Sequence, residues 1–176
     1  RVSHEGLAFD KQNNLYFVDE LNGGSIYKYV SANPNASNGN DYFAAGQTLA
    51  EALLAPTRIY VKPLLAAHRA GLLKAAAHIT GGGLPGNFPR VLPDGVVAVL
   101  EPWVVPDVFR WLARSGNVAA DEMLRVFNCG IGMALVVGAD KAEAAAALLR
   151  EHGETVLPLG RIEAAEGEAS VRFSAM

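Results

Sequence analysis

The chain is poor in cysteine, in long apolar runs and in net charge. Cys129 is the single cysteine among 176 residues, which excludes an intrachain disulfide framework and a multi-cysteine metal cluster. No apolar run reaches the roughly eighteen residues that a bilayer span requires, and no basic-then-apolar stretch resembles a signal peptide. The formal net charge is only −3, so electrostatics gives no reason to expect a nucleic acid or an anionic membrane as partner. We therefore expect no nucleic acid and no membrane among the partners.

Two segments of different composition make up the chain. Residues 1–48 hold seven of the ten asparagines and four of the five tyrosines, with Arg1 as their one arginine. From Leu49 onward alanine dominates, and arginine outnumbers lysine by nine to three. We expect domains at 1–48 and 49–176, which differ either by ordinary variation or because they come from different parent genes. The start at Arg1 suggests a removed leader or a fragment.

The first segment has the pattern of a three-stranded antiparallel meander. Runs rich in aromatic and β-branched residues favour strands at 7–10, 15–20 and 25–30. Asn22 and Gly23, between the second and third runs, are typical of a hairpin turn because both accept a positive φ. Three strands are close to the minimum that is stable alone, so we expect this meander to pair with the sheet of the second segment.

The second segment mixes helical and strand patterns, which indicates an α+β or α/β protein. Helices are expected at 49–54, 62–73, 85–91, 106–115, 121–127 and 140–152, and strands at 75–79, 96–100, 131–137, 155–162 and 169–173. We expect Asp121 to cap one helix, Asp140 and Glu143 to form a capping box on another, and Gly153 to end it. The predicted fold class is α+β, a mixed sheet covered by helices.

A glycine-rich loop after the strand at 75–79 is the best candidate for a binding site. Consecutive glycines allow a backbone with positive φ and exposed N–H groups, and a helix start would add a positive dipole end. A small anionic or phosphorylated ligand is therefore a plausible partner; the alternative is a tight strand-to-helix turn without a ligand. His78 would either orient the loop or act as a general acid–base. The candidate residues are His78, Thr80, Gly81, Gly82, Gly83, Asn87 and Arg90.

Three isolated residues have plainer interpretations. Cys129 lies in an apolar stretch with no activating base beside it, so we expect a buried structural thiol rather than a nucleophile. His68 and His152 are expected to be solvated residues on or near helix ends. The catalytic residues stay unknown at this stage.

The second segment resembles phosphoribosylformylglycinamidine cyclo-ligase, or AIR synthetase, of purine biosynthesis. The resemblance covers Gly46 to Phe173, and its motifs are 53–62, 78–93, 116–118 and 122–133. It implies an α+β C-terminal domain, a cytoplasmic location, and a ring closure that uses ATP and Mg²⁺ in the complete enzyme. The family's N-terminal domain and a Ser-Gly-x-His-Ser-Asn-Gly motif have no counterpart here. We therefore expect a chain with no cofactor of its own that keeps part of a substrate cleft but is inactive alone.

The first segment resembles one β-propeller blade of PhoX-type alkaline phosphatases, through 4–10, 14–20 and 23–29. This resemblance implies a secreted parent and a metal-binding role for Glu5, whose carboxylate suits calcium or iron; the alternative is an ordinary polar residue of the meander. The two resemblances meet near residues 45–48 and predict a chimera. A folded chimera without catalysis is the alternative function. Exposed strand edges or a swapped meander would favour a homo-oligomer.

Overall fold

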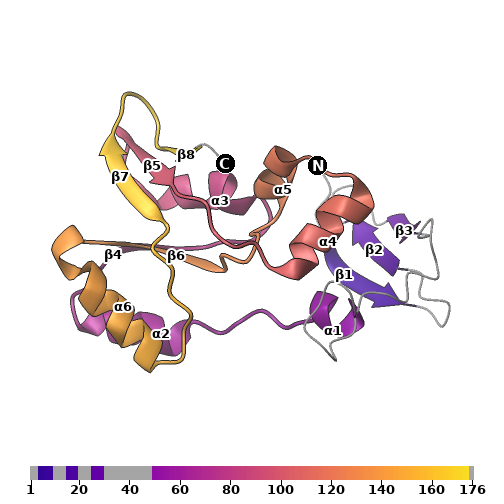
Figure 1. Cartoon of the computed structure of the whole chain (residues 1–176), viewed down its shortest axis with the longest axis horizontal. Helices are drawn as coiled ribbons and strands as arrows, with labels where there is room; N and C mark the ends of the chain where they lie inside the picture. Colours follow the sequence, from indigo (N-terminus) through magenta and orange to yellow (C-terminus); the bar gives the residue numbers. More distant parts are fainter. Residues whose placement is uncertain (1–3, 10–14, 20–24, 30–48, 175–176) are drawn as a thin grey trace. The chain divides into compact units, whose positions relative to one another are not determined.

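The computed structural model describes residues 4–9, 15–19, 25–29 and 49–174 of the chain. It divides into two compact units, Arg1–Leu54 and Ala55–Met176. Figure 1 labels the helices and strands of both units.

The first unit contains the predicted meander. Its strands are β1 (His4–Phe9), β2 (Leu15–Asp19) and β3 (Ser25–Tyr29). They pair antiparallel in the order β1-β2-β3, with a register shift in β1, which confirms the three-stranded antiparallel arrangement. The short helix α1 (Leu49–Leu53) follows. The expected turn at Asn22 and Gly23 and the junction at 45–48 lie outside the described residues, and pairing of the meander with another sheet stays a prediction.

The second unit alternates helices and strands, as its sequence pattern predicts. The helices are α2 (Val61–Arg69), α3 (Gly83–Asn87), α4 (Asp107–Gly116), α5 (Ala120–Val126) and α6 (Ala142–Glu151), with 3₁₀ turns η2 (Phe88–Val91) and η3 (Ala139–Lys141). The strands are β4 (Leu73–His78), β5 (Val96–Leu100), β6 (Met133–Val137), β7 (Gly160–Ala164) and β8 (Ser170–Phe173).

The strands of this unit form two sheets. β4 and β6 make an antiparallel pair, and β5 lies between β7, its antiparallel neighbour, and β8, its parallel neighbour. Figure 1 shows the β4–β6 pair between the β7-β5-β8 sheet and the helices α2 and α6. These two helices pack against each other. The mixed sheet and the α+β class are confirmed, while the division into two sheets was not predicted.

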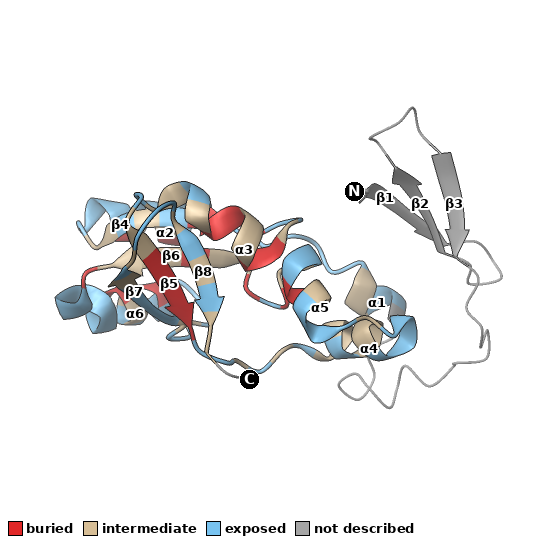
Figure 2. Cartoon of the chain, turned by 90° about the horizontal axis from the view of Figure 1, so that it is seen from above, coloured by how far each residue is buried: buried red, intermediate tan, exposed pale blue. Residues whose placement is uncertain are grey.

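The main core lies where β4 and β6 meet β5. It contains Ala77 and Ile79 from the end of β4, Leu84 and Phe88 from α3 and η2, and Leu100 from β5. Figure 2 shows β5 as a buried strand, which agrees with its continuous apolar sequence, because both faces of such a strand must be covered. A second cluster joins α5 to α4 and holds Met123, Leu124 and Cys129.

Several predicted boundaries and caps are wrong. The helix expected to reach Leu73 ends at Arg69, where Gly71 takes a positive φ, and Leu73 already belongs to β4. Ala119, not Asp121, is the N-cap of α5. Lys141 is the N-cap of α6 because η3 precedes it, so Asp140 and Glu143 form no capping box.

The predicted end of α6 and one of the two predicted C-terminal strands are confirmed, whereas the other strand is shifted. Gly153 follows α6 with a φ of 81° and its N–H donates to the Arg150 carbonyl oxygen, as predicted. The strand expected at 155–162 lies instead at Gly160–Ala164, since its position is decided by pairing with β5. The strand expected at 169–173 is confirmed as β8.

Candidate functional site: the glycine loop after β4

Strand β4 delivers the glycine loop at the end of the two-stranded sheet. His78 is the last residue of β4 and pairs with Met133 of β6. The next residue, Ile79, is 1% exposed, and its N–H donates to the Gly132 carbonyl oxygen (N···O 3.0 Å). The start of the loop is therefore held by a core side chain and by a hydrogen bond to the segment before β6.

Two of the three glycines are required by the backbone. Gly82 and Gly83 have φ values of 95° and 58°, in the region that side-chain-bearing residues rarely adopt. A Cβ atom on Gly83 would also overlap the Leu124 carbonyl oxygen and lie 2.9 Å from that of Phe127. Glycine at position 83 thus allows α3 to pack closely on the end of α5. This packing explains part of the glycine-rich pattern without a ligand.

The N–H groups of these two glycines are already engaged within the protein. The Gly82 N–H donates to the Val126 carbonyl oxygen (3.3 Å) and the Gly83 N–H to that of Thr80 (3.1 Å). Helix α3 has only five residues, which gives it little dipole. The expectation that the loop presents a row of free N–H groups to an anion is therefore wrong at Gly82 and Gly83.

Asn87 shapes the loop from within. Its side chain is buried, and Nδ2 lies within hydrogen-bonding distance of the carbonyl oxygens of Gly83 (2.8 Å), Gly81 (3.1 Å) and Thr80 (3.4 Å). An amide is suited to this position because it supplies two N–H donors and carries no charge. Asn87 thus holds the loop backbone together, and its Nδ2 donors are directed at the loop rather than at solvent.

The remaining candidate residues are exposed. His78, Thr80 and Gly81 lie at the start of the loop, whereas Arg90 lies in η2, which follows the short helix α3. Within the described part of the chain, no hydrogen bond or ion pair engages the Arg90 guanidinium. The groups exposed here are therefore a cation in η2 and an imidazole and a hydroxyl at the start of the loop, rather than a row of amides.

Tyr60 belongs to this neighbourhood and was missed by the sequence analysis. Its ring meets that of His78 edge to face, with centroids 6.1 Å apart and planes inclined by 66°. Burial raises the pKa of the Tyr60 hydroxyl, and the nearby Glu154 carboxylate raises it further, while Arg58 acts in the opposite direction. One signal could have found it: Tyr60 is the only tyrosine after residue 48.

Cys129 is the structural thiol that its sequence context predicts. It is 1% exposed, and burial raises the pKa of its thiol, which disfavours the reactive thiolate. Its carbonyl oxygen accepts a hydrogen bond from Trp103 Nε1 (2.9 Å). His68 and His152 are exposed, as expected.

A metal site has no support among the residues whose placement is described. No group of three or more histidine, cysteine, aspartate or glutamate side chains there could hold an ion. Glu5 lies in β1, but its side chain is outside the described part of the chain, so its metal-binding role stays a prediction. The same described residues include no helix that is long and apolar enough to cross a bilayer.

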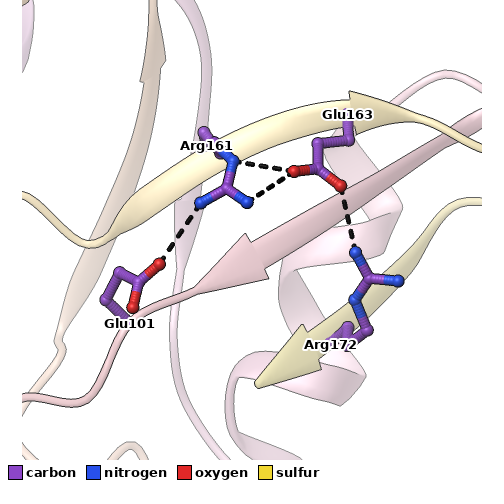
Figure 3. Close-up of polar contacts among 4 residues, drawn as sticks. All are labelled: Glu101, Arg161, Glu163 and Arg172. Atoms are coloured by element: carbon purple, nitrogen blue, oxygen red, sulfur yellow. Dashed lines mark hydrogen bonds and ion pairs between the residues drawn. The ribbon is translucent and has the colours of Figure 1, made fainter. Parts of the chain in front are cut away.

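A charged cluster lies on the three-stranded sheet β7-β5-β8 (Figure 3). Arg161 and Glu163 of β7 pair with each other, Glu163 also pairs with Arg172 of β8, and Arg161 reaches Glu101 just after β5. Both arginine side chains are 61% exposed. Because cations and carboxylates neutralise one another here, this cluster is a paired surface rather than a site for a charged ligand.

Comparison with known proteins shows an extensive likeness over most of the chain. Residues 14–172 match the family described as AIR synthase related protein, C-terminal domain. The match begins before the junction expected near residues 45–48, so the family relationship includes much of the first segment. The foreign origin of residues 1–48 is therefore not shown.

Curated relatives give the same result. Proteins named phosphoribosylformylglycinamidine cyclo-ligase from Neisseria meningitidis serogroups C, A and B are each 47% identical to this chain over 149 residues. The matched part is 84% of this chain but only 43% of each relative. The chain thus spans less than half the length of the curated relatives that it matches.

Proposed function

Because the chain belongs to the family of AIR synthase related proteins, C-terminal domain, we propose that it is the C-terminal part of a phosphoribosylformylglycinamidine cyclo-ligase. The observation that carries the proposal is the 47% identity to proteins of that name over 84% of the chain. In the complete enzyme, ATP would activate the amide oxygen of the substrate before the imidazole ring closes. A cytoplasmic location follows from the same proposal.

The part of the cleft that this chain would contribute is the glycine loop. Arg90 would attract a phosphate group of the substrate by charge, and Thr80 would donate its hydroxyl to a phosphate oxygen. Gly81 would let the ligand approach the backbone, since a Cβ atom there would meet nothing within 4 Å. Gly82, Gly83 and Asn87 would hold the loop in shape, as their positive φ values and hydrogen bonds indicate.

Magnesium does not fit the residues at hand. The described residues hold no group of carboxylates or imidazoles suited to an ion, so none of the roles proposed for them involves Mg²⁺. Phosphoryl transfer requires charges positioned around the phosphates and the metal. We therefore propose that the chain alone does not close the ring and that the ATP-binding residues belong to other parts of the complete enzyme.

Two measurements test this function. Incubation of the chain with ATP, Mg²⁺ and phosphoribosylformylglycinamidine should give no aminoimidazole product above the rate without protein; product above that rate would contradict the proposed inactivity. A titration with inorganic phosphate, followed by NMR, should move the amide signals of Thr80 and Gly81. The matched control is Arg90→Gln, which removes the charge and should reduce the response. Unchanged amide signals in the wild-type chain would remove the anion site.

A second proposal is that residues 1–48 form a foreign propeller-like blade in a chimera without catalysis. It is supported by the abrupt change in composition at Leu49 and by the antiparallel order β1-β2-β3 of the first unit. In this proposal the meander pairs with an edge of another sheet, within one chain or between two copies. Rapid amide exchange throughout β1, β2 and β3, together with a monomeric mass in solution, would contradict it.

A further inference from the structure

Tyr60 lies immediately before α2, where it is the N-cap residue, and its ring projects onto the end of the two-stranded sheet. There it meets the ring of His78, the last residue of β4, in an edge-to-face arrangement. Edge-to-face packing is favourable because the positive ring edge of one partner meets the negative face of the other. This contact joins residues that are far apart in sequence.

The backbone at Gly132 is the second surface that Tyr60 touches. A Cβ atom built on Gly132 would overlap Oη of Tyr60 and lie 3.0 Å from its Cζ. The carbonyl oxygen of the same glycine accepts the hydrogen bond from Ile79 N–H. The phenol ring therefore lies directly on the backbone that anchors the start of the glycine loop, and a Cβ atom at position 132 would require the ring to move.

The segment that carries Tyr60 is tied to the end of α6. Arg58 pairs with Glu154 (Nε···Oε2 2.8 Å) and donates to the Gly153 carbonyl oxygen (2.5 Å). Because burial and Glu154 raise the pKa of Tyr60, the phenol is protonated at neutral pH and packs without a charge. Tyr60 is thus held on three sides, by its own segment, by His78 and by Gly132.

We propose that Tyr60 is a positioning residue for His78: together with the Gly132 backbone it holds the imidazole in one orientation at the entrance of the glycine loop, where the imidazole contacts an oxygen of an anionic ligand. His78 is an exposed residue, so its ring contacts Tyr60 and is still accessible to a ligand. The inference deepens the proposed function and rests on the anion site of that proposal.

The test is a titration of the full chain with inorganic phosphate, followed through the ring proton signals of His78. Tyr60→Phe keeps the ring and should leave the apparent Kd for phosphate within about twofold of wild type. Tyr60→Leu removes the aromatic contact and should weaken phosphate binding by about fivefold or more, which corresponds to about 1 kcal/mol. In the absence of phosphate, the His78 ring signals should already differ from wild type in Tyr60→Leu.

Gly132→Ala displaces the Tyr60 ring without changing Tyr60 or His78, and should reproduce the Tyr60→Leu result. Its matched control is Gly86→Ala, because a Cβ atom on Gly86 would meet nothing within 4 Å; this variant should bind phosphate like the wild type. Circular dichroism of each variant distinguishes loss of positioning from loss of fold. If Tyr60→Leu does not fold, a folded Gly132→Ala variant still tests the inference.

Two results would overturn the inference in distinguishable ways. If the wild type and the Tyr60→Leu and Gly132→Ala variants all bind phosphate equally well, the anion site stands and the positioning role is wrong. If the wild type shows no response to phosphate at His78, Thr80 or Gly81, the anion site of the proposed function is wrong and the inference falls with it.

Discussion

Glu163 of β7 accepts a hydrogen bond from Arg172 of β8 (3.0 Å), although β5 lies between the two strands. In the register of the sheet, Glu163 lies beside Val97 and Arg172 beside Val99, and side chains of neighbouring residues in a register point to the same face. The ion pair therefore bridges the sheet over the two valines, which are 8% and 4% exposed. The long aliphatic parts of charged side chains can cover apolar surface in this way.

Glu163→Gln should lower the free energy of unfolding by about 1 kcal/mol or less, because the arginine partners are largely exposed and such ion pairs contribute little. The loss should shrink further at high salt, which screens exposed charges. Urea unfolding at low and high ionic strength measures both effects. Glu143→Gln is the matched control, since Glu143 is 90% exposed in its pair with Arg150, and should change nothing measurable. A loss above about 2 kcal/mol at position 163 would contradict this view of the cluster.

Gly83→Ala should destabilise the fold by more than about 2 kcal/mol, because the added Cβ atom would overlap a carbonyl oxygen of α5 in a backbone with positive φ. Gly81→Ala, for which the Cβ atom meets nothing within 4 Å and φ is not in the left-handed region, should be close to neutral. Thermal unfolding of the two variants side by side gives the comparison. Equal melting temperatures would show that α3 and α5 do not pack as described.

Asn87→Asp should be more harmful than Asn87→Ala at neutral pH. The aspartate would bring a negative charge against the carbonyl oxygens that the amide now contacts, and a buried charge without donors is costly, by about 3 kcal/mol or more. The pKa of this introduced carboxyl would be raised in the folded state, so its protonated form would be favoured. The loss in free energy of unfolding relative to wild type should therefore shrink as pH falls. Urea unfolding at two pH values tests this, and a deficit that grows on acidification would contradict it.

Cys129 should react slowly with a thiol reagent in the folded protein and rapidly in urea, because burial both hides the thiol and raises its pKa. A raised folded-state pKa means that the thiol's contribution to stability is present below about pH 9 and is lost as pH rises through the folded value. Cys129→Ala should therefore lose less stability than wild type as pH rises through this range. Rapid native labelling would show that the second core cluster is open to solvent.

Local sequence patterns predicted the strand at 96–100 to the residue. An uninterrupted apolar run after the turn at Gly95 leaves few alternatives, because such a run must be covered on both faces. They also located the glycine loop, since its candidate residues lie within one short stretch from His78 to Arg90. The stop at Gly153 was predictable for the same reason: positive φ after a helix is a local requirement.

Where local sequence signals compete, only the tertiary structure determined where each helix or strand begins. The pattern at 155–162 favoured a strand, but the strand begins at Gly160, where pairing with Leu100 of β5 begins. Asp140 and Glu143 have the spacing of a capping box, yet a 3₁₀ turn precedes α6 and moves its start. Propensities of this kind amount to fractions of a kcal/mol per residue and are overridden by packing.

The composition, the scarcity of cysteine and the positions of most helices and strands followed from the sequence by itself, because each depends on residues close together in the chain. Which groups of the glycine loop a ligand could reach did not follow from the sequence. The acceptor for Gly82 comes from α5, and the ring that contacts His78 comes from Tyr60, before α2. Contacts between distant residues form only when the chain folds, and they determine which N–H groups and side chains of the loop remain accessible to a ligand.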